Sequence, residues 1–255
     1  MCLKQINEWF VANKLSLSLD KTCYTVFSKS NVNQLSIQLN GIDIKRVNSC
    51  RYLGVIIDCE LKWKEHIEYI YKKLVKYSSI FYKLRNILPS SCLRSIYYAF
   101  VHPHILYGIE IYANTFSTYL KPLNVLNNKL LRILQNCRLQ TPVADLYWEY
   151  QTLPINQLFI LQILTLVHTF FYRNNELPEI YRDYFVINST VHSHCTRQKS
   201  DLHISSVQKS IGQKSIQYVG SVLWNEIPQL LKNPMSKYTF KRKLKAHLLN
   251  EQAIF

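Results

Sequence analysis

The chain has few glycines, and three common catalytic signatures are missing from it. Only five of its 255 residues are glycine. This argues against an enzyme that cradles phosphate in a glycine-rich loop and against an all-β fold with many tight turns. A GxSxG nucleophile elbow, a Walker A loop and an HExxH pair are all absent from the sequence. Active sites of these three kinds are therefore not indicated.

Cysteine is present, but in no pattern that would bind zinc or form a disulfide framework. The count of seven is odd, the spacing is irregular and no CxxC pair occurs, so neither a zinc knuckle nor a zinc ribbon is indicated. The first ten residues mix Lys4, Asn7 and Glu8 with apolar residues, unlike a signal peptide. We therefore expect free thiols in an intracellular protein of the nucleus or the cytoplasm.

Adjacent acidic residues are also missing, since neither Asp-Asp nor Glu-Asp occurs anywhere in the chain. Phosphoryl transfer by a polymerase needs two metal ions held by clustered carboxylates. Asp58 and Glu60 together offer too few oxygen ligands for Mg²⁺. His102 and His104 lack a third partner at ligand spacing, so structural histidines are the favoured interpretation. The sequence thus predicts no metal or other cofactor in this chain.

Positive charge is abundant and unevenly distributed. Lys and Arg number 31 against 16 Asp and Glu, which gives a net charge of +15. Residues 60–100 and 181–255 hold most of this surplus, with net charges of +5 and +7, whereas residues 101–180 are neutral. Polyanions are the usual partners of so basic a chain. We expect the neutral stretch to form buried packing and the basic stretches to provide contact surfaces.

Apolar residues make up 48% of the chain, enough to build a real core. The stretch from Ile155 to Tyr172 comes closest to a membrane span, but polar residues such as Asn156, Gln162 and His168 interrupt it. A span of this length is normally almost free of such groups. A buried or amphipathic helix is the better interpretation, and no membrane partner is expected.

The first sixty residues have mixed helical and strand character. Apolar spacing predicts a helix from Met1 to Leu15, followed by strand character from Leu15 through Tyr24 to Phe27. Asn40-Gly41 lies between alternating apolar residues and is a strong signal for a hairpin turn. A further strand-like run around Tyr52 to Ile57 is interrupted by Gly54, which indicates a bulge or a close approach by another backbone. Nucleic acid is one candidate for that approach.

Helical spacing of apolar residues dominates the rest of the chain, so the fold class is α+β and mostly helical. The predicted helices are His66–Leu88, Leu93–Phe100, His104–Tyr112, Leu120–Leu139, Tyr150–Arg173 and the basic helix Thr239–Leu249. The predicted divisions are residues 1–60 (α/β), 61–140 (helical), 141–190 (helical region with a linker) and 191–255 (basic tail). The small sheet would expose edges and an apolar face, so we expect a truncated domain.

Three segments stand out, and each has a purely structural interpretation. Trp9 to Phe27 predicts a helix, a loop and a strand, with Trp9 and Phe10 in the core. Cys50 to Ile67 predicts a buried strand, a turn and the start of a helix. Ser215 to Pro228 predicts a capped, packed helix around Trp224 that ends before the proline. No known chemistry needs the spacing of the third segment.

In this order, the segments resemble the region just downstream of the catalytic hairpin in non-LTR (LINE-type, Jockey-like) retrotransposon reverse transcriptases. The matching strings are WFVANKLSLSLDKTCYTVF, RYLGVIID followed by LKWKEHI, LRSIYYAFVHPHILYGIEIY, and GQKSIQYVGSVLWNEIP with FKRKLKAHLL. Together they extend over nearly the whole chain. The first two are specific as a pair, and the later ones are typical of the family but looser.

The resemblance implies a role for each division of the chain. Residues 1–60 would be the end of the palm sheet, residues 61–140 a helical thumb, and the remainder the C-terminal region of the same polyprotein. Lys21 matches a lysine thought to assist the incoming nucleotide, and Tyr52-Leu53-Gly54 matches the primer grip, which holds the primer end. The full-length family enzyme uses Mg²⁺, but the metal-binding aspartates have no counterpart here, so we expect this chain alone to be inactive.

Basic side chains supply the expected contacts with a primer–template duplex of RNA and DNA. The candidates around the thumb are Lys62, Lys64, Lys72, Lys76, Lys83 and Arg85, with Lys73 and Arg94 adding charge. Three of them, Lys72, Lys76 and Lys83, fall on one side of a helix, where a solvated face is the alternative. The tail adds Lys241, Arg242, Lys243 and Lys245, for which nuclear targeting is an alternative.

Three hypotheses remain open from the sequence. The chain is a reverse transcriptase fragment that holds primer and template; or it is a stand-alone nucleic-acid-binding protein derived from one; or it is a helical interaction module without a nucleic-acid role. The first two rest on the segregated positive charge, and the third on the neutral stretch 101–180. None of them predicts a small-molecule substrate for this chain alone.

Overall fold

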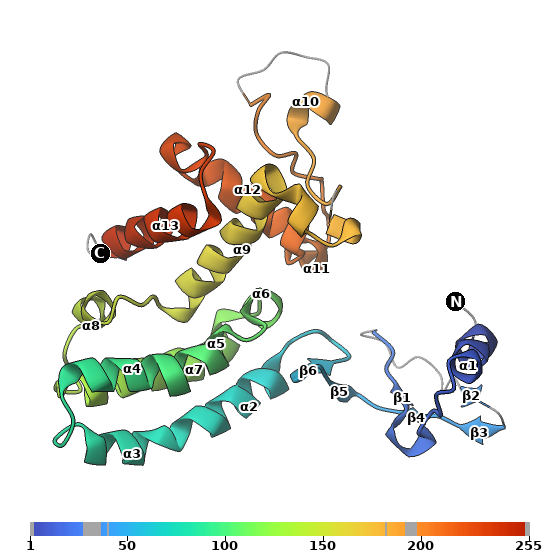
Figure 1. Cartoon of the computed structure of the whole chain (residues 1–255), viewed down its shortest axis with the longest axis horizontal. Coiled ribbons are helices and arrows are strands. Elements are labelled where there is room, and N and C mark those ends of the chain that lie inside the picture. Colours follow the sequence, from blue (N-terminus) through green and yellow to red (C-terminus); the bar gives the residue numbers. More distant parts are fainter. Residues whose placement is uncertain (1–2, 28–36, 40, 182, 192–197, 253–255) are drawn as a thin grey trace. The chain divides into compact units, whose positions relative to one another are not determined.

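The structure, a computed structural model, is mostly helical with a few short strands, which confirms the α+β class (Figure 1). It describes residues 3–27, 37–39, 41–181, 183–191 and 198–252. The chain divides into two compact units, Met1–His66 and Ile67–Phe255. The four divisions predicted from the sequence stay predictions.

The first unit contains the strands, paired two by two. Its elements are α1 (Leu3–Ala12), the 3-10 turn η1 (Leu19–Lys21), β1 (Cys23–Tyr24), β2 (Gln38–Leu39), β3 (Ile42–Asp43), β4 (Lys45–Arg46), β5 (Ser49–Tyr52) and β6 (Val55–Asp58). β1 pairs in parallel with β4, while β2–β3 and β5–β6 are antiparallel. The strand expected between Leu15 and Phe27 is confirmed only at β1, because the chain turns through η1 before it.

The Asn-Gly signal correctly located the first hairpin. Leu39 pairs with Ile42, so the chain reverses between these two residues. Gly41 has φ +77°, the left-handed conformation that glycine adopts at no steric cost. Asn40 itself lies outside the described residues.

The expectation that Trp9 lies in the core is wrong. Its side chain is 53% exposed, and Phe10 is only partly buried. The strands of this unit form three separate two-stranded ladders. Ladders of this size have too little apolar surface to cover a helix. The first unit therefore leaves one side of α1 open to solvent.

The second unit is built from helices. Its first part comprises α2 (Lys64–Val75, which begins at the end of the first unit), α3 (Tyr77–Leu84), α4 (Ser90–Phe100), α5 (His102–Leu106), α6 (Ile109–Tyr112), α7 (Ser117–Leu134) and α8 (Val143–Glu149). Figure 1 shows α3, α4 and α7 side by side, and α7 contacts both of the others. Tyr97 of α4 donates a 3.2 Å hydrogen bond to Asn127 of α7, and Asn127 donates to the Tyr147 hydroxyl of α8 at 3.1 Å. This buried network joins the three helices.

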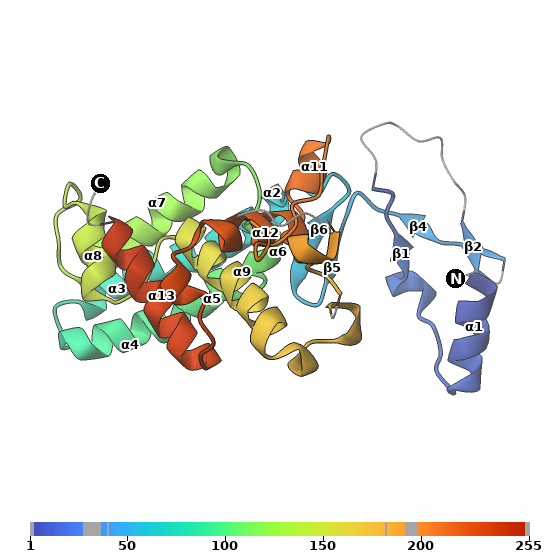
Figure 2. The same ribbon diagram turned by 90° about the horizontal axis from the view of Figure 1, so that it is seen from above.

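Helix α9 (Ile155–Tyr172) is the centre of the second part. It contacts α6, α12 (Ile216–Glu226) and α13 (Lys237–Gln252), which Figure 2 shows around it. Its length and composition alone would also allow it to cross a membrane. In the structure it is a packed helix, and the side chains of Ile163, Leu164 and Val167 are completely buried. Between α9 and α12 lie η2 (Asn174–Glu176), η3 (Glu179–Tyr181), α10 (Asn188–Val191) and α11 (Ser210–Gln213), and η4 (Gln229–Leu231) precedes α13.

The last two helices match their predictions closely. Ser215 caps α12 by accepting the N–H of Tyr218 at 3.2 Å, Trp224 is buried, and the helix ends before Pro228. The basic helix α13 begins after Ser236, whose hydroxyl oxygen accepts the N–H of Thr239 at 3.1 Å. Side-chain oxygens at these positions satisfy backbone donors that a helix start leaves unpaired.

Several predicted helix boundaries are wrong. The helix expected from His104 to Tyr112 is divided at Gly108 into α5 and α6, and the helix expected up to Leu139 ends at Leu134. The helix expected from Tyr150 is divided, because residues 150–154 turn between α8 and α9 and Pro154 fixes the new start. The long helix expected from His66 to Leu88 is split into α2 and α3 at Lys76, which nevertheless keeps helical angles of φ −61° and ψ −29°. The backbone at Lys76 is therefore still helical, as predicted, although the helix is divided there.

Candidate nucleic-acid interface

The segment that resembles a primer grip is the tip of the β5–β6 hairpin. Tyr52 pairs with Val55, so Leu53 and Gly54 form a two-residue connection. Their φ angles are +45° and +85°, as a type I′ turn requires. The strand bulge predicted at Gly54 is wrong, because the glycine lies in the turn itself.

The hairpin tip is exposed and strained. Tyr52 is 63% exposed and Leu53 is 72% exposed. A left-handed conformation costs an ordinary L-residue about 1–2 kcal/mol, because its Cβ approaches a carbonyl oxygen. Leu53 adopts this conformation at a solvent-exposed position. Strain of this kind often accompanies a functional contact, so the tip is the first candidate site.

Asp58 organises the loop that follows the hairpin. Its Oδ1 accepts the backbone N–H of Glu60 at 3.1 Å and of Lys62 at 3.0 Å, and its Oδ2 accepts that of Trp63 at 2.7 Å. Leu61 and Trp63 both have left-handed φ angles, of +53° and +62°. The carboxylate therefore holds a strained five-residue connection between β6 and α2.

His66 anchors the hairpin to the start of α2. Arg51 and Ile56 face each other as a non-hydrogen-bonded pair of the antiparallel ladder. The N–H of Ile56 therefore points away from β5. His66 Nδ1 accepts this N–H at 3.2 Å, and the side chain is 1% exposed. Burial, together with the charge of Arg51, lowers the pKa of His66 to about 4. A neutral imidazole is the form that can accept this bond.

The remaining candidates of the first unit lie on its surface. Lys21 is exposed at the end of η1. Lys64 is exposed at the first position of α2. Lys62 is partly buried and forms a 2.8 Å ion pair with Glu60. The two exposed lysines can therefore contact phosphate directly, while Lys62 is partly neutralised.

Helices α2 and α3 present the predicted basic row. Lys72, Lys76 and Lys83 are all exposed, but Lys72 forms a 2.7 Å ion pair with Glu68 one turn earlier. The guanidinium of Arg85 lies 4.6 Å from the centre of the Tyr82 ring, a cation–π contact. Lys76 and Lys83 are thus the more available charges of the row.

The basic residues of helix α13 differ in their exposure to solvent. Arg242 and Lys243 are exposed, whereas Lys241 and Lys245 are partly buried. Burial and the charge of Arg94 on α4 lower the pKa of Lys245. The fold therefore brings a basic residue of the tail close to one of the predicted thumb, although they are far apart in sequence.

The two histidines of the HPH string, His102 and His104, are both partly buried. The ring of His102 lies 4.9 Å from the ring of Tyr98. Burial and the charge of Lys245 lower the pKa of His102 to about 4. Burial and the charge of Lys73 lower that of His104. In the part of the chain that the structure describes, no three His, Cys, Asp or Glu side chains could hold a metal ion. The described residues thus offer no carboxylate cluster of the kind that a polymerase's catalytic Mg²⁺ needs, and Asp58 already accepts three N–H groups.

Several curated proteins are similar to half of the chain. The RNA-directed DNA polymerases from mobile element jockey of Drosophila funebris and Drosophila melanogaster are 26% and 25% identical over 133 residues, 51% of this chain. A probable RNA-directed DNA polymerase from transposon X-element of Drosophila melanogaster is 22% identical over 136 residues. This confirms the resemblance to non-LTR reverse transcriptases. The match extends over 14% of the length of the jockey polymerases.

A fourth relative is shorter than these reverse transcriptases. An uncharacterized protein of Caenorhabditis elegans is 27% identical over 143 residues, which make up 52% of this chain and 68% of that protein. No family model matches the chain. No solved structure matches it either. The link to non-LTR reverse transcriptases therefore rests on sequence similarity to these polymerases.

Sequence reasoning missed several features of the site. It weighed Asp58 only as a metal ligand, although Asp side chains commonly accept backbone N–H groups of the residues that follow them in a turn. It assigned no role to His66, which carries no local signal. The approach of Lys245 to Arg94 depends on tertiary packing and could not be found from spacing.

Proposed function

We propose that this chain is the nucleic-acid-holding part of a non-LTR reverse transcriptase. The exposed, left-handed hairpin tip at Tyr52-Leu53-Gly54 carries the proposal. It would hold the primer end through its backbone, as the primer grip of the family does. The similarity to the jockey polymerases supports this assignment.

Basic residues of the second unit would hold the duplex without reading its sequence. Lys76 and Lys83 on α2–α3 and Arg242 and Lys243 on α13 are exposed. Side chains of this kind bind phosphates and release counterions, so affinity falls steeply as salt concentration rises. RNA and DNA are therefore the proposed partners, and catalysis by this chain alone is not part of the proposal.

A salt series tests the function directly. Filter binding of the purified chain to an RNA–DNA primer–template should give a steep linear dependence of log K on log salt. The variant Lys76→Gln/Lys83→Gln should lower the slope by up to about 1.8, since each phosphate contact contributes about 0.9. The matched control is Lys199→Gln/Lys209→Gln, two exposed lysines outside these helices. A flat response of the unmodified chain to salt would refute the proposal.

A primer-extension assay tests the expected lack of catalysis. With Mg²⁺, template, primer and nucleotides, the chain should incorporate nothing, because the described residues offer no carboxylate cluster for the metal ions. Robust synthesis would contradict this part of the proposal while leaving binding intact.

A second candidate is a stand-alone nucleic-acid-binding protein of the same origin. The match that extends over 68% of a shorter protein of Caenorhabditis elegans favours it. Under this proposal the chain would bind blunt duplexes and primer ends equally well. Preference for a recessed primer end, lost on substitution at Gly54, would instead favour the primer-holding function.

A further inference from the structure

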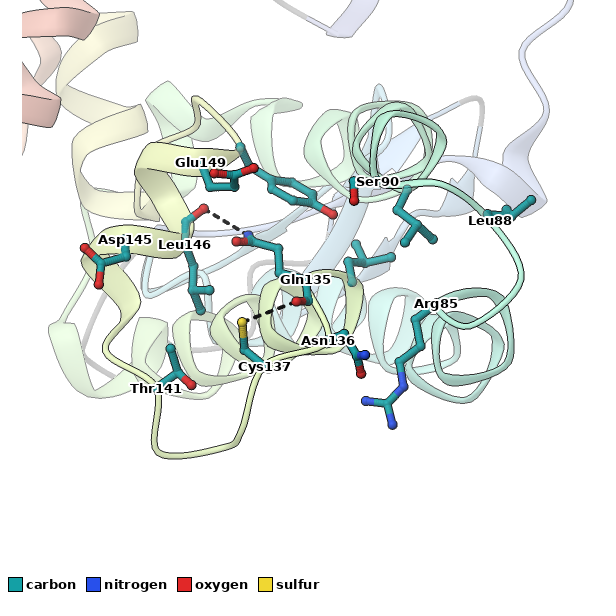
Figure 3. Close-up of a pocket in the computed structure, with 13 residues that line it drawn as sticks. Arg85, Leu88, Ser90, Gln135, Asn136, Cys137, Thr141, Asp145, Leu146 and Glu149 are labelled. Carbon is teal, nitrogen blue, oxygen red and sulfur yellow. Dashed lines mark hydrogen bonds between the residues drawn. The ribbon is translucent and has the colours of Figure 1, made fainter.

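A cavity of about 510 Å³ lies within the second unit. Its walls come from the end of α3, the start of α4, the end of α7 and one side of α8 (Figure 3). The volume falls in the range of small-ligand pockets. Residues of opposite charge line it, with Arg85 on one side and Asp145 and Glu149 on another.

Two polar groups at this cavity have no partner in the described part of the chain. Tyr150 lines the cavity and is 3% exposed, and its buried hydroxyl forms no hydrogen bond to the described residues. The same is true of the buried Nε of Arg85. Buried polar groups are nearly always hydrogen-bonded. A ligand that donates and accepts hydrogen bonds would satisfy both groups.

The carboxylates of Asp145 and Glu149 are also unpaired. They lie four residues apart on α8, and neither forms an ion pair with a Lys, Arg or His side chain of the described residues. Both side chains are exposed beside the cavity and so are accessible to a ligand. Burial, and next the charge of Glu149, raises the pKa of Tyr150 to about 12. Glu149 and Tyr150 both line the cavity.

The arrangement fits a ligand with a hydrogen-bond donor edge and an anionic group. In Figure 3, Asp145 and Arg85 lie on opposite sides of the cavity. A guanidinium binds phosphate through paired N–H donors. Carboxylates accept hydrogen bonds from the exocyclic amine of a base, such as N4 of cytosine. Uracil has no such amine.

We propose that this cavity holds one unpaired nucleotide of a bound strand, with its phosphate on Arg85 and an amino-bearing base toward Glu149 and Asp145. The Tyr150 hydroxyl hydrogen-bonds to the same base. This inference rests on the nucleic-acid-holding function proposed above and adds a specificity to it. The preferred bases are cytosine, adenine and guanine, and uracil is disfavoured.

Titration of the whole chain with the four nucleoside monophosphates tests the specificity. Isothermal calorimetry or NMR should show saturable binding of CMP, AMP and GMP, and binding of UMP about tenfold weaker, since one good base contact is worth about that factor. Cytidine should bind more weakly than CMP, and Arg85→Gln should remove that difference. Equal affinity for all four nucleotides, or for cytidine and CMP, would overturn the proposal.

Conservative variants separate binding from folding. Tyr150→Phe removes a hydroxyl that has no protein partner among the described residues, so its melting temperature should be unchanged or higher while CMP affinity falls about tenfold. Glu149→Gln and Asp145→Asn should reduce the preference for CMP over UMP. Glu226→Gln, an exposed acid on α12, is the matched control. Unchanged CMP affinity in all three pocket variants would overturn the proposal.

The proposed function and this inference can fail separately. A chain that binds the primer–template with a steep salt slope but shows no saturable mononucleotide binding refutes the pocket alone. A chain that binds CMP selectively but not the primer–template refutes the holding function and leaves the pocket as a nucleotide site.

Discussion

The carboxylate of Asp58 accepts the backbone N–H of Trp63 at 2.7 Å. The same side chain accepts two more N–H groups of the loop, and two residues of this loop, Leu61 and Trp63, are left-handed. One carboxylate thus offsets the strain of the connection that leads from the grip-like hairpin into α2.

Replacing Asp58 with alanine should release this loop. Hydrogen bonds to a charged group contribute about 1.5–3 kcal/mol each when buried. Since Asp58 is only partly buried, we expect a loss of about 2 kcal/mol in total. Native-state hydrogen exchange should show faster exchange at Lys62 and Trp63. The control Glu65→Gln, an exposed acid nearby on α2, should leave both amides protected. Unchanged protection in Asp58→Ala would show that other contacts hold the loop.

Replacing Leu53 with asparagine should stabilise the hairpin. Asn-Gly is the preferred pair for a type I′ turn because asparagine tolerates the left-handed conformation, which Leu53 adopts at φ +45°. We expect a gain of about 1 kcal/mol in the free energy of unfolding. If the tip holds nucleic acid through its backbone, this variant keeps its primer affinity. Gly54→Val, at φ +85°, should instead lose both stability and binding. Equal stability of the two variants would contradict the turn assignment.

Of the two hairpins of the first unit, β2–β3 and β5–β6, the turn of only the first could be predicted from the sequence. Asn40-Gly41 was found because both residues favour the turn conformation. Leu53-Gly54 was taken as part of an interrupted strand, since leucine ordinarily avoids positive φ. The strain that hid this turn from prediction is also what marks it as a candidate site.

In the second unit, local signals predicted helices well and tertiary relationships poorly. Ser215, Trp224 and Pro228 defined α12 because capping, burial and termination are local effects. The cavity beside Arg85 and Tyr150 was missed. Its walls come from four helices, and their meeting depends on packing that no spacing encodes.

His66, which is buried, and His102, which is partly buried, should make the chain less stable in acid. The pKa values of His66 and His102 are lowered from 6.5 to about 4 in the folded state, so the unfolded state binds more protons below pH 6.5. The stability that depends on these two neutral histidines is therefore fully present above about pH 6.5, and it is lost as the pH falls toward 4. Between pH 7 and pH 5 each histidine should cost about 2 kcal/mol.

Urea unfolding at pH 7 and pH 5 measures this loss. His66→Asn keeps an acceptor for the Ile56 N–H but cannot titrate, so the pH dependence assigned to the first unit should shrink. His102→Phe keeps the aromatic contact with Tyr98 and should do the same for the second unit. A pH dependence that neither variant reduces would place the titrating groups elsewhere.

Removing a negative charge from α2 should strengthen nucleic-acid binding. Glu68 pairs with Lys72 at 2.7 Å, and both side chains are more than half exposed. Exposed pairs add little stability, so Glu68→Gln should leave unfolding nearly unchanged. It would free Lys72 for phosphate and steepen the salt slope by up to about 0.9. The control Glu226→Gln on α12 should leave the slope unchanged. A weaker affinity in Glu68→Gln would place the duplex away from this face.

Gly220 sets the distance between α12 and its neighbours. A Cβ at this position would lie 2.8 Å from Cε1 of Phe185 and 3.1 Å from Cγ2 of Val167 on α9. Overpacking of this kind lowers the free energy of unfolding by about 1–3 kcal/mol. Replacing a glycine inside a helix with alanine raises it by about 1 kcal/mol, because alanine favours the helix. Gly220→Ala should therefore destabilise the second unit by up to about 2 kcal/mol in urea unfolding. The double variant Gly220→Ala/Phe185→Leu should recover part of this, because it removes the nearest ring atoms. A single variant as stable as the original chain would mean that α12 can move away from α9 at little cost.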